Sequence, residues 1–71
     1  MNMATADRIY DLIEKAIRKA RRDGITGMSI ANLKQITPTT GLTCPVDEYH
    51  RVFPQIALTV ALRLRFTITN G

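Results

Sequence analysis

The 71-residue sequence predicts a small α+β domain with two to three helices and a C-terminal strand. Two patterns predict this class. In the first third of the chain, apolar residues recur every three or four positions, which indicates an amphipathic helix. From Ile56 to Ile68 the apolar residues instead occupy every even position, which is typical of a strand with one buried face. A chain of this length makes one domain, residues 1–71.

The first helix is predicted at residues 5–23. Gly24 follows it and supplies the residue that commonly ends a helix in the left-handed conformation. The apolar stripe that should face the core consists of Ile9, Leu12, Ile13, Ala16, Ile17 and Ala20.

The second helix is predicted to begin at Ser29, whose hydroxyl can accept a backbone N–H from the first turn. Met28 and Leu33 are spaced for a hydrophobic staple across this start. Thr37 precedes Pro38, which disfavours helical backbone at Thr37, so the helix should stop there.

The third helix is predicted to start with Pro45. Two alternatives remain for its end. The helix stops near Phe53 and the even-numbered apolar series is a strand, or the helix continues to about Ala61 with a kink at Pro54. Pro in a helix interior costs about 3 kcal/mol, whereas a strand from Ile56 to Ile68 would be much longer than usual. The second alternative makes the fold mainly helical.

Both alternatives predict a strand from Arg63 onward that ends at Asn70-Gly71. Residues 25–28 are extended and could pair with residues 66–69. The other edge of the strand then lacks a partner, which invites pairing with a second copy of the chain. Because so small a core also needs reinforcement, we expect a homodimer.

The order of these elements, and the segment Met28-Ser29-Ile30-Ala31-Asn32-Leu33-Lys34-Gln35-Ile36, resemble a reduced winged helix-turn-helix regulator. The resemblance implies a compact DNA-binding regulator of the kind found in phages and mobile elements. The sequence departs from the pattern in two ways. It has no hairpin turn for a wing, and the helix that would read bases begins with Asp47 and Glu48, which phosphates repel.

Basic residues are the candidate nucleic-acid contacts, because the ten Lys and Arg residues give the chain a net charge of +4. A cluster at the end of the first helix would contact phosphates, and two further residues would lie nearer the groove. Cations also favour the last turn of any helix, which is the structural explanation for the cluster. The candidates are Lys15, Arg18, Lys19, Arg21 and Arg22 for phosphates, with Lys34 and Arg51 nearer the groove.

Two members of the cluster follow an acidic residue by four positions, which favours ion pairs along the helix. The expected pairs are Asp11 with Lys15 and Glu14 with Arg18. Each should stabilise the helix by a few tenths of a kcal/mol.

The alternative function is a protein-binding modulator or inhibitor of a host factor, such as an anti-defence protein. Its interface would use an exposed strand edge or aromatic anchors. An aromatic pair four residues apart can equally close a small core. The candidate interface residues are Tyr49, Phe53, Leu64, Phe66 and Ile68.

Enzymatic activity is not expected. The single cysteine, Cys44, and the single histidine, His50, are six residues apart and would point away from each other on one helix. Structural zinc needs four ligands, so we expect no metal and no cofactor. A lone cysteine favours a reducing cytoplasm. The most apolar tract, 52–66, is too short to cross a bilayer, so no membrane partner is expected.

Overall fold

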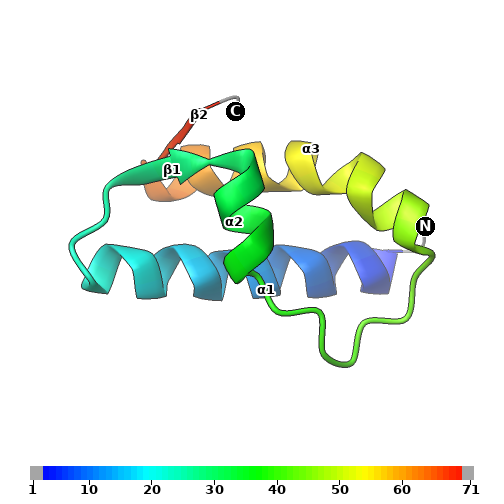
Figure 1. Ribbon diagram of the computed structural model, residues 1–71. Coiled ribbons are helices and arrows are strands. Elements are labelled where there is room, and N and C mark those ends of the chain that lie inside the picture. The colour runs from blue at the N-terminus through cyan, green and yellow to red at the C-terminus, as the bar shows by residue number, and fades with distance from the viewer. Residues whose placement is uncertain (1–2, 70–71) are drawn as a thin grey trace.

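The computed structural model describes residues 3–69 and contains three helices and a two-stranded sheet (Figure 1). This arrangement agrees with the predicted α+β class, and the order helix, strand, helix, helix, strand is the predicted one. The elements are α1 (Met3–Arg22), β1 (Gly27–Ser29), α2 (Ile30–Ile36), α3 (Val46–Leu64) and β2 (Thr67–Thr69).

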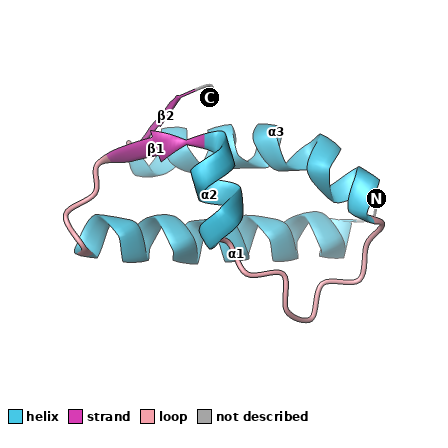
Figure 2. Ribbon diagram, viewed as in Figure 1, coloured by secondary structure: helices cyan, strands magenta, loops and turns pink. Residues whose placement is uncertain are grey.

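The two long helices lie side by side and run in the same direction, while α2 crosses in front of them (Figures 1 and 2). Contacts near the C-terminal ends fix this arrangement. Arg21 of α1 donates a hydrogen bond to the carbonyl of Leu64 at the end of α3. The core between the three helices contains, as its largest fully buried side chains, Ile9, Ile13, Ile17, Leu33, Phe53 and Val60.

Helix α1 forms as predicted, and its whole apolar stripe is buried. The helix ends one residue earlier than expected, at Arg22. Gly24 follows in the left-handed conformation with φ of 85°. The N–H of Gly24 bonds the carbonyl of Arg21 at 3.0 Å, and the N–H of Ile25 bonds that of Ala20 at 3.0 Å. This is a Schellman motif, in which glycine carries the left-handed residue without a steric penalty.

The predicted boundaries of α2 are confirmed. The hydroxyl of Ser29 accepts the N–H of Asn32 at 3.1 Å and caps the helix start. At the other end, the N–H and the hydroxyl of Thr37 both donate to the carbonyl of Leu33, at 3.0 and 2.6 Å. Thr37 is buried, so its hydroxyl needs this partner.

Of the two alternatives for α3, the helix that continues through Pro54 is confirmed, and the prediction of a strand from Arg63 onward is wrong. The helix continues through Pro54 and past Arg63, so residues 56–64 are helical and the strand begins only at Thr67. Pro54 cannot donate the helical hydrogen bond to the carbonyl of His50, at a cost of about 3 kcal/mol. Burial of an apolar face offsets this cost. The buried residues of α3 are Tyr49, Phe53, Ala57, Val60 and Ala61.

Strands β1 and β2 pair in parallel, which confirms the predicted pairing of the two extended segments. Gly27 lies opposite Thr67. A Cβ at Gly27 would lie 2.8 Å from both the Cβ and the carbonyl oxygen of Thr67, so only glycine permits this close approach. Within residues 3–69 each strand has one edge without a sheet partner. The predicted stop at Asn70-Gly71 lies outside the described residues.

Candidate nucleic-acid interface

The parallel arrangement of α1 and α3 separates charge along the molecule. Residues 14–23 and 63–65, which we call the basic end, hold seven of the ten Lys and Arg residues but two of the six acidic residues. Both helices finish there, so their negative dipole ends also favour cations. The N-terminal halves of the two helices carry the other acidic residues, Asp7, Asp11, Asp47 and Glu48.

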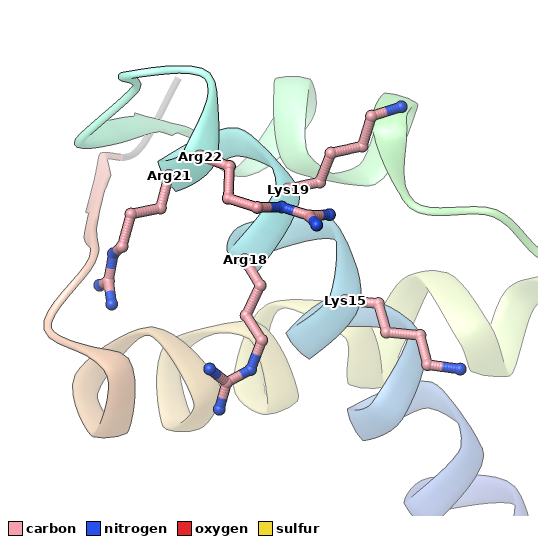
Figure 3. Close-up of a pocket in the computed structure, with 5 residues that line it drawn as sticks. All are labelled: Lys15, Arg18, Lys19, Arg21 and Arg22. Atoms are coloured by element: carbon pink, nitrogen blue, oxygen red, sulfur yellow. The ribbon is translucent and has the colours of Figure 1, made fainter.

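Five side chains of α1 in the basic end fan out from the helix around a hollow (Figure 3). The hollow has a volume of about 760 Å³ and is open to solvent. An open surface of this kind suits an extended polyanion better than a small molecule, which is usually held in a concave and mostly apolar pocket. The lining residues are Lys15, Arg18, Lys19, Arg21 and Arg22, the predicted phosphate contacts.

Of the two ion pairs predicted along α1, one forms. The Nε and Nη2 atoms of Arg18 donate to Oε2 of Glu14 at 3.0 and 2.8 Å. Lys15 makes no ion pair with Asp11 in the structure. The positive charge of Arg18 is therefore partly neutralised, whereas that of Lys15 is not.

Glu14 also joins α1 to α3. Its Oε1 atom lies 3.4 Å from Nη1 of Arg63, and the same nitrogen donates to the hydroxyl of Tyr10 at 3.0 Å. The hydrogen bond from Arg18, together with the charges of Arg18 and Arg63, holds the pKa of Glu14 below its ordinary value of 4.5 and outweighs partial desolvation. One carboxylate thus lies between two guanidinium groups, which leaves this part of the surface with a net positive charge.

The remaining cations of α1 fall into two groups. Arg21 has a structural partner, since it donates to the carbonyl of Leu64, one of the acceptors that a helix end leaves unpaired. The side chains of Lys15, Lys19 and Arg22 are exposed and make no hydrogen bond or ion pair with any other residue in 3–69. These three side chains are available to a ligand.

Arg65 adds a cation at the end of α3 in an unfavourable backbone conformation. Its φ is 55°, the left-handed region that costs a residue with a Cβ roughly 1–2 kcal/mol. The N–H of Arg65 bonds Leu62 at 3.3 Å and that of Phe66 bonds Ala61 at 2.8 Å, as in the Schellman motif of α1. The exposed side chain of Arg65 therefore occupies a position at which glycine would be the more stable choice.

Lys34 and Arg51 are not brought to the basic end. The Nζ atom of Lys34 lies 3.1 Å from Nδ1 of His50 and 5.5 Å from the centre of the Phe53 ring, so Lys34 joins α2 to α3. Arg51 is exposed in the N-terminal half of α3, which also carries Asp47 and Glu48. Neither residue adds to the surface formed by the five cations of α1.

The residues predicted to form a protein interface mostly belong to the core. Tyr49, Phe53 and Phe66 are buried, so Tyr49 and Phe53 close the core, as the alternative for this aromatic pair predicted, and do not project as anchors. The rings of Tyr49 and Phe53 pack with centres 5.5 Å apart. Leu64 and Ile68 are half-buried against the same cluster. Burial raises the pKa of Tyr49, with a smaller contribution from the charge of Cys44.

Two exposed apolar residues of α3 were missed by the sequence analysis. Leu58 is 51% exposed and Leu62 is 82% exposed. The alternation from Ile56 to Ile68 assigned both to a buried strand face. Their spacing of four residues, on the side of the helix opposite Phe53, is the signal that could have identified them.

Cys44 and His50 line the same small hollow of about 280 Å³, which is otherwise mainly apolar. The thiol of Cys44 donates to the carbonyl of Pro45 at 3.6 Å. Within residues 3–69 no three His, Cys, Asp or Glu side chains gather as metal ligands. Over the same residues no helix is both long and apolar enough to cross a membrane.

Known protein families, curated proteins and solved structures gave no match to this chain. Functional proposals therefore depend on the geometry of the described residues.

Proposed function

We propose that the protein is a small non-enzymatic DNA-binding regulator of the phage or mobile-element type, which contacts phosphates through the basic end. The observation that carries this proposal is the set of three exposed cations without a partner in 3–69: Lys15, Lys19 and Arg22. Their spacing of four and three residues places them on one stripe of α1. Several cations held on one helix displace counterions from a nucleic-acid backbone.

A purely structural explanation accounts for only part of this stripe. The helix dipole stabilises cations in the last turn, which includes Lys19 and Arg22, but the effect falls off before Lys15. Like charges four residues apart, as in Lys15 and Lys19, destabilise a helix by a few tenths of a kcal/mol. The three side chains span about 10 Å along the helix axis, which suits contacts with successive phosphates.

In this proposal the protein contacts the phosphates of DNA and does not read its bases. The order of the elements supports the predicted likeness to winged helix-turn-helix regulators. However, residues 37–45 join α2 to α3 in place of a tight turn, and α3 begins with two acidic residues. Phosphate contacts position a protein without reading sequence, so we expect weak sequence preference.

Duplex binding measured over a range of salt concentrations tests the proposal. We expect the wild-type affinity to fall steeply with salt. The triple variant Lys15→Ala, Lys19→Ala, Arg22→Ala should flatten the slope of log K against log[salt] by about three units, because each lost contact removes about one. A wild-type protein that binds no duplex at low salt would contradict the proposal.

One observation favours the alternative, a protein-binding modulator. Strand β1 has one edge without a sheet partner in 3–69, and its residues Gly27 and Met28, with Asn32 of α2, help to line an open groove of about 370 Å³. Ile25 and Ile36 also line it and are 42% and 48% exposed. An extended peptide can add a strand to such an edge and place apolar side chains in the groove. Absence of duplex binding would promote this function.

A further inference from the structure

The outer side of α3 carries a stripe of exposed side chains that continues to the residue capping the helix. Successive members are three or four residues apart, so they share one face of the helix. The centre of the stripe is apolar, since Leu58 and Leu62 are 51% and 82% exposed. Its members are Asp47, Arg51, Gln55, Leu58, Leu62 and Arg65.

This stripe is complementary to itself when reversed, because it has an acidic residue at one end and a basic residue at the other. In an antiparallel copy, Asp47 would face the partner subunit's Arg65. Arg51 would face the partner subunit's Leu62, where the aliphatic part of the arginine can cover the leucine. Gln55 would face the partner subunit's Leu58. A two-fold axis near the middle of α3 produces every one of these contacts twice.

We propose that a second copy of the chain binds this face, which makes the outer side of α3 the interface of an antiparallel homodimer. The two leucines form the apolar centre and the pairs between Asp47 and Arg65 fix the direction. The interface also explains why Arg65 is kept in a left-handed conformation that favours glycine. The proposal goes beyond nucleic-acid binding, since the three free cations lie on α1, outside the stripe.

Sedimentation equilibrium across a range of protein concentrations tests the interface. We expect the wild type to approach twice the 8.0 kDa mass of the chain. Leu62→Lys should increase the dimer dissociation constant at least about tenfold, since it removes an apolar contact and places a like charge opposite the partner subunit's Arg51. The control is Ile36→Lys, which changes a half-exposed residue of α2 and should leave the dimer intact. Circular dichroism checks whether both variants remain folded.

Charge reversal provides a test that does not depend on the leucines. Asp47→Arg or Arg65→Asp alone should weaken the dimer at least about tenfold, because each places like charges opposite one another. The two substitutions together should restore association to within about threefold of the wild type. Asp is among the residues that tolerate left-handed backbone, so it suits position 65.

Two results would overturn the proposal. One is a wild-type monomer at high micromolar concentration. The other is a dimer that persists in Leu62→Lys and in both charge reversals, which would indicate pairing at a free strand edge. Thr67→Pro does not discriminate these cases, because the N–H of Thr67 already bonds the carbonyl of Thr26 at 3.2 Å within the chain.

Discussion

Helices α1 and α3 have nearly the same length, 20 and 19 residues, and lie side by side, yet they are built differently. The apolar stripe of α1 is buried, and the helix is followed by Gly24 in the left-handed conformation. Helix α3 contains Pro54, exposes Leu58 and Leu62, and is followed by Arg65 in the left-handed conformation.

The difference indicates that helix stability alone does not account for the sequence of α3, whereas it accounts for that of α1. Helix α1 follows the local rules for composition and capping, so its sequence alone specifies it. Helix α3 breaks three of those rules and is held by packing against α1. Departures from local rules in a folded protein are expected at functional surfaces. In α3 the exposed leucines and Arg65 belong to the proposed dimer interface.

Pro54→Ala should have the largest effect on this comparison. The substitution restores the missing helical N–H and should raise the free energy of unfolding by about 1–3 kcal/mol. Chemical denaturation of both proteins measures the change. A clear loss of stability would mean that the packing of α3 requires Pro54 itself.

Gly24→Ala should give a smaller effect of opposite sign. A Cβ at Gly24 would meet no atom within 4 Å, so the change isolates the cost of left-handed backbone. We expect a loss of about 1–2 kcal/mol in the free energy of unfolding. An unchanged melting curve would show that the end of α1 adapts to a right-handed residue.

Arg65→Gly should stabilise the monomer by about 0.5–1 kcal/mol, because the left-handed conformation then has no steric penalty. The same variant should associate more weakly, since it lacks the partner for Asp47. Thermal melts at a dilution where the protein is monomeric separate the two effects. If stability falls instead, contacts of the Arg65 side chain outweigh its backbone cost.

Glu14→Gln should have the smallest effect, and one that depends on pH. The pKa of Glu14 is lowered in the folded protein, so its contribution to stability is present above the ordinary value of 4.5 and is lost as pH falls through the lowered value. The variant should melt slightly below the wild type at pH 7, and this difference should shrink below about pH 4.5. A difference that is constant with pH would exclude the charge of Glu14 as its cause.

Local patterns were sufficient to predict α1, the caps of α2 and the pairing of the two extended segments. In α3 they left residues 55–61 open between helix and strand and wrongly predicted a strand from Arg63 onward, because Ala57 and Ala61 occupy odd positions of the alternating series. The strand alternative put both alanines on the exposed face, whereas both are buried in the core. Helix packing, which overrides a short-range period, decided the outcome.

The residues of the candidate site could be predicted from the sequence, but the contacts that each of them makes could not. The density of Lys and Arg near the end of α1 identified the cluster. Which of these cations are free depends on the parallel contact that brings Arg63 to Glu14 and Arg21 to Leu64. No spacing rule along one chain contains that information, because the residues involved are more than forty positions apart.

The most direct test of the central claim compares Arg22→Ala with Arg8→Ala. Both arginines are exposed on α1 and their side chains lack a hydrogen-bond or ion-pair partner within 3–69, so the substitutions remove the same charge from opposite ends of one helix. The measurement is the salt dependence of duplex binding. We expect Arg22→Ala to lower the slope of log K against log[salt] by about one unit and Arg8→Ala to leave it nearly unchanged. Equal losses would show that only net charge matters and would contradict a phosphate contact at the basic end.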